Sequence, residues 1–285
     1  MRQGVGRVES ARIAQRPSLV HSLFELRFPL EAALFWIHGI QHPWPRADQS
    51  NRKTVMMIPG FMAGDLTLTP LAVFCRWLGH RTSFAGIRSN SACPRETLMH
   101  LERHLERAYA ASQRRVVVLG QSLGGVYARE LAARRPDLIE RVITLGSPIR
   151  AVEDSSNPWV VAAAKLVAMI RGVDDGCLTS SCQCGIALVE RPAGEVPTTV
   201  VYSRTDGVVH WESCVDRSGN RAVENVEVMA SHVGMGLNAD VYRVLAERLA
   251  AAPRISVQHR VRSGAAARNL RPLRLIHSRE VPQLT

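Results

Sequence analysis

From residue 54 onward, short apolar and β-branched runs alternate with longer stretches in which apolar residues recur at helical spacing. The short runs are bounded by Gly, Pro or charged residues, as buried strands usually are. Six runs predict strands: TVMMIPG at 54–60, RTSFAGI at 81–87, RRVVVLG at 114–120, RVITLGS at 141–147, TTVVYSR at 198–204 and ENVEVMAS at 224–231. Four stretches predict helices, at 69–79, 95–112, 124–135 and 239–251. This alternation favours an α/β fold with a mostly parallel sheet covered by helices on both faces.

Three other segments set the expected domain organisation. Residues 1–53 form an N-terminal extension whose apolar stretch at 22–40 is interrupted by charges and Pro29, which predicts an amphipathic helix. Such a helix can pack on the domain or lie at a membrane surface. Residues 149–195 interrupt a catalytic domain at 54–252 and predict a lid-like cap insertion. Residues 253–285 form a basic tail that we expect to be disordered.

The charge distribution limits the choice of partner. The chain carries 36 Lys/Arg against 25 Asp/Glu, a net charge of +11 that would suit a polyanionic ligand. The excess lies at the ends: residues 1–54 carry 8 Lys/Arg and 4 Asp/Glu, and residues 254–285 carry 7 and 1. Residues 55–253 carry 21 and 20 and are close to neutral. We therefore expect no nucleic-acid-binding domain, although the basic ends can still contact an anionic membrane or RNA.

Other classes are disfavoured by what the sequence lacks. No uncharged apolar run reaches about 18 residues, so no transmembrane helix is predicted, and the first twenty residues do not resemble a signal peptide. A cytoplasmic protein is expected, with peripheral membrane contact as an open alternative. The six cysteines form no pair of CxxC motifs, so neither a metal nor a cofactor is expected. Cys177, Cys182, Cys184 and Cys214 leave a disulfide open, with free thiols the default.

The strongest chemical signal is the segment RRVVVLGQSLGGVYARELAARRP, which places G-x-S-x-G between an apolar strand and an amphipathic helix. A serine on a sharp strand-to-helix turn has its hydroxyl lifted clear of the sheet. Gly120 and Gly124 omit side chains that would collide there. The segment predicts Ser122 as a nucleophile, and a Gly-rich helix cap is the structural alternative.

A serine nucleophile requires a base and an acid that orients the base. Asp206 follows the strand candidate at 198–204, and His232 follows the one at 224–231. The resulting order Ser, Asp, His is the order of the α/β-hydrolase arrangement. Asp154, which also follows a strand end, is the main alternative acid. Asp216 is expected to be solvated.

The oxyanion formed during acyl transfer requires two N–H donors. The turn Pro59-Gly60-Phe61 follows the first strand, so the N–H of Phe61 is one candidate donor. The N–H of Leu123, at the start of the helix after Ser122, is the other. An ordinary turn is the structural alternative at Phe61.

The segments IPGFMAGD, GQSLGGVYAREL, VITLGSP, YSRTDGVVHWESC and ENVEVMASHVGMGLNADV together resemble the α/β-hydrolase superfamily. Within it they are similar to bacterial lipases and esterases related to GPI inositol-deacylases and triacylglycerol lipases. Pro59 stands where lipases carry a histidine of the His-Gly motif. The resemblance implies cleavage of carboxylic esters through an acyl-enzyme on Ser122, with His232 as base and Asp206 as its partner.

The expected substrate is an acyl lipid or another apolar small-molecule ester. A thioesterase or an acyltransferase would use the same triad, because these enzymes differ in the group that resolves the acyl-enzyme. A non-catalytic interaction protein with this fold is a further alternative. The oligomeric state is not predicted.

Overall fold

The computed structural model describes residues 50–149 and 194–251, together with Pro17, Glu25, Arg46, Ala47, Ala162, Leu166 and Met169. The predicted amphipathic helix at 22–40, the insertion at 149–195 and the tail at 253–285 therefore lie almost entirely outside the described residues. Among the described helices, none combines the length and the hydropathy needed to cross a membrane.

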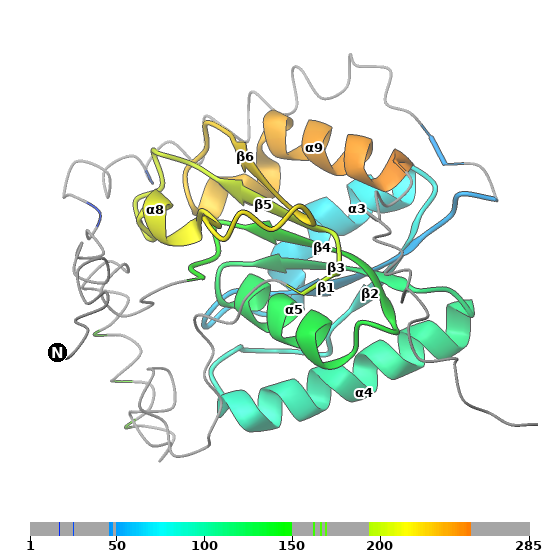
Figure 1. Ribbon diagram of the computed structural model, residues 1–285. Coiled ribbons are helices and arrows are strands. Elements are labelled where there is room, and N and C mark those ends of the chain that lie inside the picture. The colour runs from blue at the N-terminus through cyan, green and yellow to red at the C-terminus, as the bar shows by residue number, and fades with distance from the viewer. Residues whose placement is uncertain are drawn as a thin grey trace, which may run out of the picture. The chain divides into compact units, whose positions relative to one another are not determined.

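Six parallel strands form the sheet, in the order β2-β1-β3-β4-β5-β6 (Figure 1). The strands are β1 (Thr54–Ile58), β2 (Arg81–Phe84), β3 (Val116–Gln121), β4 (Ile139–Leu145), β5 (Thr198–Tyr202) and β6 (Val223–Glu227). All five residues of β1 are buried, as expected of a central strand that is covered on both faces. The edge strand β6 instead exposes Asn225 and Glu227, polar residues that suit a sheet edge. Every strand predicted from the sequence is confirmed.

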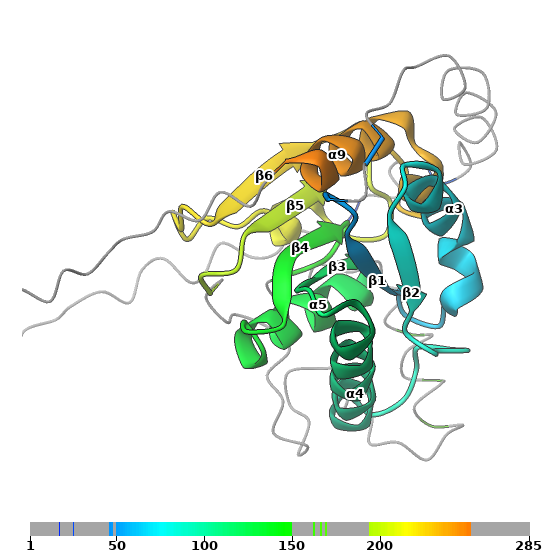
Figure 2. The ribbon, with the colours of Figure 1, turned by 90° about the vertical axis from the view of Figure 1, so that its right-hand side faces the viewer.

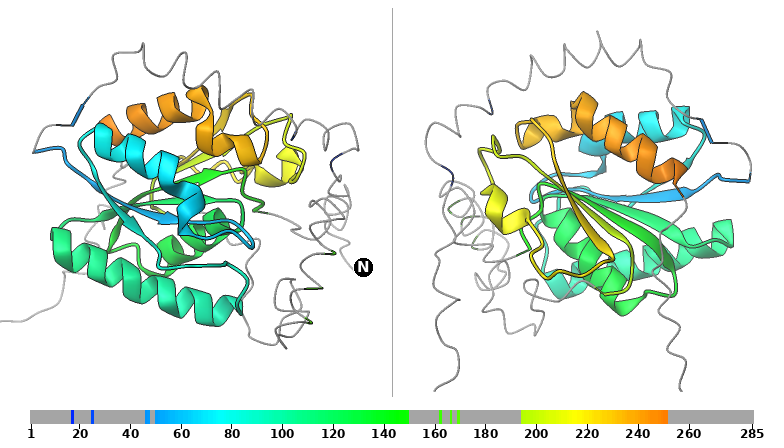
Figure 3. Two further views of the ribbon diagram at one scale, coloured as in Figure 1. Left: turned by 180° about the vertical axis from the view of Figure 1, so that it is seen from behind. Right: turned by 45° about the horizontal axis from the view of Figure 1, so that its top comes forward.

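Helices cover both faces of the sheet. They are α3 (Thr69–Trp77), α4 (Pro94–Ser112), α5 (Leu123–Arg134) and α9 (Ala239–Ala250), with short turns η2 (Asp65–Leu68), α8 (Trp211–Cys214) and η4 (Val233–Leu237). Figures 1 and 2 show α4 and α5 on one face and α3 and α9 on the other, and Figure 3 repeats these layers from behind and from above. The four predicted helices are confirmed to within a few residues at their ends.

Each face of the sheet carries its own apolar core. On one side, α4 buries Leu98, Leu101 and Leu105, which recur at three- and four-residue intervals and pack with α5 on the sheet. On the other side, Phe74 of α3 and Tyr242 of α9 meet with ring centroids 4.4 Å apart. The leucine row on one face and the ring pair on the other exclude water from the sheet, and this burial of apolar surface is the main contribution to stability.

The direction in which successive strands are added to the sheet reverses between β1 and β3. The chain passes from β1 to β2 on one side and then returns to β3 on the other side of β1. In open parallel sheets, ligands bind at such a switch point, beyond the carboxyl ends of the strands. Gly60 and Phe61 follow β1, and Ser122 follows β3. The fold therefore brings the predicted nucleophile and the predicted oxyanion turn together.

Candidate active site

Ser122 occupies a strained turn between β3 and α5. Its backbone angles are φ 52° and ψ −126°, a conformation that residues other than Gly rarely adopt. Close packing enforces the turn: a Cβ on Gly124 would lie 2.1 Å from the carbonyl oxygen of Ile58, and one on Gly120 would lie 2.3 Å from that of Gly124. The turn predicted from G-x-S-x-G is therefore present, with both glycines needed by their backbone neighbours.

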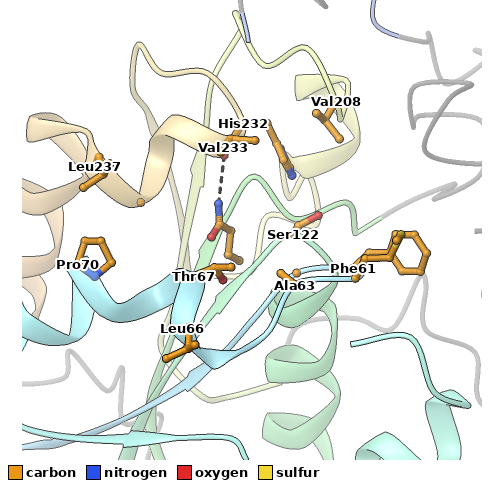
Figure 4. Close-up of a pocket in the computed structure, with 14 residues that line it drawn as sticks. Phe61, Ala63, Leu66, Thr67, Pro70, Ser122, Val208, His232, Val233 and Leu237 are labelled. Carbon is orange, nitrogen blue, oxygen red and sulfur yellow. Dashed lines mark hydrogen bonds between the residues drawn. The ribbon is translucent and has the colours of Figure 1, made fainter. Parts of the chain in front are cut away.

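His232 and Asp206 form a buried pair beside Ser122. The Nδ1 atom of His232 lies 2.7 Å from Oδ2 of Asp206, and their side chains are 8% and 1% exposed. The other oxygen, Oδ1, accepts the N–H groups of Val208 and Val209, each at 2.8 Å. An ionised carboxylate held in this way accepts the Nδ1–H of the imidazole and leaves Nε2 as the acceptor. Figure 4 shows the ring of His232 directed toward the hydroxyl of Ser122.

The electrostatics of His232 favour its protonated form. Burial lowers the pKa of His232, but the charge and hydrogen bond of Asp206, with a further contribution from the charge of Glu25, raise it, and the net shift is upward from 6.5. The interactions that raise this pKa also stabilise the imidazolium that forms when a neighbouring hydroxyl gives up its proton. The pair can therefore act as a general base toward Ser122.

The predicted oxyanion donors Phe61 and Leu123 belong to the turns that follow β1 and β3. Leu123 is the first residue of α5, so its N–H has no acceptor within the helix. Phe61 lies in the turn beyond β1, and the N–H groups of the next two residues are bonded to the carbonyl oxygens of Asn90 and Gly60. Met62 has φ 57°, so this turn also stores strain. Both predicted donors thus lie on turns next to Ser122.

A cavity of about 670 Å³ opens in front of Ser122 and His232 (Figure 4). Among the residues that the structure describes, no Asp, Glu, Lys or Arg lines it; the lining residues are Gly60, Phe61, Met62, Ala63, Leu66, Thr67, Pro70, Gln121, Ser122, Val208, His232, Val233, Gly236 and Leu237. Met62, Leu66 and Val233 are 50%, 84% and 53% exposed. The cavity therefore suits an uncharged, apolar ligand.

Three residues that the sequence analysis did not assign to the site also contact it. A Cβ on Gly146, which follows β4 with φ 56°, would lie 3.0 Å from Oδ2 of Asp206 and 3.1 Å from Nδ1 of His232. The side-chain amide of Gln121 donates to the carbonyl oxygen of His232 at 3.1 Å. Glu25 accepts hydrogen bonds from the backbone of the Asp206 and His232 loops. Neither a loop glycine nor a distant Glu carries a sequence motif that reveals such a role.

The sequence also offered an alternative acid, cysteines for a disulfide, and an aspartate expected to be solvated. Asp154 and three of the four cysteines considered for a disulfide lie outside the described residues, whereas Cys214 is buried and its thiol is free. The expectation that Asp216 is solvated is wrong, because its side chain is 5% exposed and pairs with Arg129 at 2.8 Å. Within the described ranges, no group of three or more His, Cys, Asp or Glu side chains could hold a metal ion.

Comparison with known proteins identifies the fold. No protein-family model and no curated protein matches the sequence. Among solved structures, a soluble variant of monoglyceride lipase from Saccharomyces cerevisiae is similar with a TM-score of 0.52 at 14% identity, over 73% of this chain and 89% of the lipase. The parallel sheet, its flanking helices and this likeness show that the chain has the α/β-hydrolase fold.

Two further structures have lower scores. Aspergillus fumigatus lipase B has a TM-score of 0.49 at 14% identity, over 72% of this chain and 54% of the lipase, so the match spans about half the length of that protein. An extracellular α/β-hydrolase from a Paenibacillus species has a TM-score of 0.47 at 14% identity, over 71% of this chain and 99% of that one.

Proposed function

We propose that the chain is a serine hydrolase that cleaves carboxylic esters of apolar acyl groups. The observation that carries this proposal is the buried pair of His232 and Asp206, joined at 2.7 Å, with the imidazole directed toward a strained Ser122. These three side chains line or adjoin one cavity beyond the sheet. The fold of known lipases supports the same chemistry, although a fold alone fixes no reaction.

The proposed mechanism has two halves. Nε2 of His232 takes the proton of Ser122 as Oγ attacks the ester carbonyl, and the N–H groups of Phe61 and Leu123 bind the oxyanion. His232 then gives its proton to the leaving alcohol, and the acyl group remains on Ser122. A water molecule, deprotonated by His232, attacks the acyl-enzyme, and His232 returns this proton to Oγ of Ser122 as the bond to the acyl group breaks and the acid leaves. Asp206 holds the imidazole in the required tautomer throughout.

The substrate class follows from the cavity. Because the described part of its lining carries no acidic or basic side chain except His232, the acyl group is expected to be uncharged and apolar. Burying one methylene contributes about 0.8 kcal/mol, which corresponds to roughly a fourfold gain in kcat/KM per added carbon while the chain still fills the cavity.

Hydrolysis of p-nitrophenyl esters from acetate to laurate tests the proposal. The kcat/KM should rise with chain length and then level off, and Ser122→Ala should abolish turnover. Asp206→Asn should lower turnover on the order of 10⁴-fold, because the wrong tautomer of His232 is then favoured. Asp154→Asn is the matched comparison for the alternative acid. Turnover that persists in Ser122→Ala would contradict the proposal.

A further inference from the structure

Glu25 stands at a junction between the two loops that carry the acid and the base. Its Oε1 accepts the N–H of Gly207 at 2.9 Å and the N–H of His232 at 2.8 Å, and its Oε2 accepts the N–H of Val233 at 3.1 Å. Gly207 directly follows Asp206 in the chain. One carboxylate therefore fixes the backbone next to both members of the buried pair, from a position 182 to 208 residues earlier in the sequence.

These hydrogen bonds are of a strong kind. A carboxylate that accepts backbone N–H groups forms charge-assisted bonds, which are about twice as strong as those between neutral groups. Three such bonds meet on a single side chain here. The imidazole of His232 must stay within a few tenths of an ångström of its productive position, since a displacement of about 1 Å can cost roughly 10²-fold in rate. The carboxylate of Glu25 is placed to prevent such a displacement.

Glu25 also acts through its charge. The charged groups that act on His232 among the described residues are Asp206, on the loop after β5, and Glu25. Both favour the imidazolium and raise the pKa of His232 against the opposing effect of burial. The negative charge of Glu25 thus distinguishes it from a purely structural anchor, because it raises the proton affinity of the base itself.

We propose that Glu25 is a positioning residue of this active site: its carboxylate holds the Asp206 and His232 loops in register and stabilises the imidazolium formed during catalysis. The inference rests on the proposed function for its catalytic consequence. It does not make Glu25 a catalytic residue, because its contacts are to backbone N–H groups and not to Ser122.

The variants Glu25→Gln and Glu25→Asp separate the two parts of this role. In Glu25→Gln the amide oxygen can still accept N–H groups, but the charge is lost and an NH₂ group faces the N–H of Val233. In Glu25→Asp the charge is kept on a shorter side chain. Glu212→Gln is the matched control, because Glu212 is an exposed carboxylate on α8 that pairs with Arg217 at 3.3 Å.

The decisive measurement is the pKa of His232, followed by NMR of the full chain with ¹³C-labelled histidine and assigned with His232→Gln. The pKa of His232 should be lower in Glu25→Gln than in the wild type and unchanged in Glu212→Gln, and Glu25→Asp should recover most of the wild-type value. In ester hydrolysis, Glu25→Gln should lower kcat roughly 10- to 100-fold with little change in KM, and the acid limb of kcat/KM should move to lower pH.

Three outcomes would overturn the inference. One is a wild-type pKa of His232 in Glu25→Gln, even if the melting temperature falls, because Glu25 would then be a structural tether alone. Another is an equal shift in Glu212→Gln, which would indicate a general charge effect. The third is an unchanged kcat in a Glu25→Gln variant of active enzyme. Because the NMR titration needs no substrate, an inactive wild type would contradict the proposed function while the titration still decides the role of Glu25.

Discussion

Gly146 shows how a residue without a functional group can still determine the geometry of a site. It follows β4 with φ 56°, and the space for a Cβ is occupied by Oδ2 of Asp206 and Nδ1 of His232 at about 3 Å. Gly146→Ala should therefore displace the buried pair and lower kcat roughly 100-fold. Steady-state hydrolysis of a p-nitrophenyl ester, together with urea unfolding, measures both effects.

Gly219→Ala is the matched control for backbone strain. Gly219 has φ 70°, but a Cβ there would meet no atom within 4 Å. The control should lose about 1 kcal/mol of unfolding free energy and keep the wild-type kcat, because it combines the same strain with no contact to the site. Equal losses of kcat in the two variants would show that the contact of Gly146 with the pair is unimportant.

At the scale of single residues, the sequence reveals those site residues that come just after the end of a predicted strand. Ser122, Asp206 and His232 could be selected because each lies one or two residues beyond a predicted strand, and parallel strands bring their carboxyl ends to one edge. Glu25 could not be selected, because a charge inside an apolar stretch resembles the polar face of an amphipathic helix. Gly146 stands next to last in the run RVITLGS, where an ordinary turn residue is expected, and its positive φ cannot be read from the sequence.

The contact between α5 and β1 is the element-scale feature on which the site depends. A Cβ on Gly124 would lie 2.1 Å from the carbonyl oxygen of Ile58, which is backbone and cannot rotate away. Gly124→Ala should push α5 from the sheet and lower the free energy of unfolding by about 3 kcal/mol. Urea unfolding followed by circular dichroism measures this loss.

Gly194→Ala provides the comparison, because a Cβ at Gly194 meets nothing within 4 Å. Its free energy of unfolding should stay within about 0.5 kcal/mol of the wild type. If Gly124→Ala is equally stable, the close approach of α5 to β1 is not required by the fold.

The elements themselves were predictable to different degrees. All six strands and the four long helices show in the apolar pattern because each must bury one or two faces. The short turns η2, α8 and η4 were not predicted, since segments of four or five residues are too short to show a helical period. Two of them matter to the site: η2 provides Leu66 and η4 provides Val233 to the cavity rim.

At the scale of the whole molecule, the positive charge belongs to the ends of the sequence and not to residues 55–253. Residues 55–253 carry 21 Lys/Arg against 20 Asp/Glu, whereas residues 254–285 carry 7 against 1. Deletion of residues 254–285 should therefore lower the salt concentration needed to elute the protein from heparin and leave ester hydrolysis unchanged. Unchanged elution after the deletion would place the polyanion contact elsewhere.

The parallel sheet and its two helical layers were predicted from the alternation of strand and helix patterns, and the crevice between β1 and β3 follows from the strand order. The lid-like insertion at 149–195 and the amphipathic helix at 22–40 remain predictions. Their patterns indicate local structure, but apolar spacing alone does not specify which surface each segment would cover.

The central claim is that Ser122 is an activated nucleophile, and covalent labelling tests it most directly. A fluorophosphonate probe should label the wild-type protein on Ser122, as mapped by mass spectrometry of the peptide that contains GQSLGG. Ser122→Ala should take up no label, and His232→Gln should be labelled far more slowly because the base is missing. Equal labelling of the wild type and Ser122→Ala, or a label carried by another residue, would contradict the account.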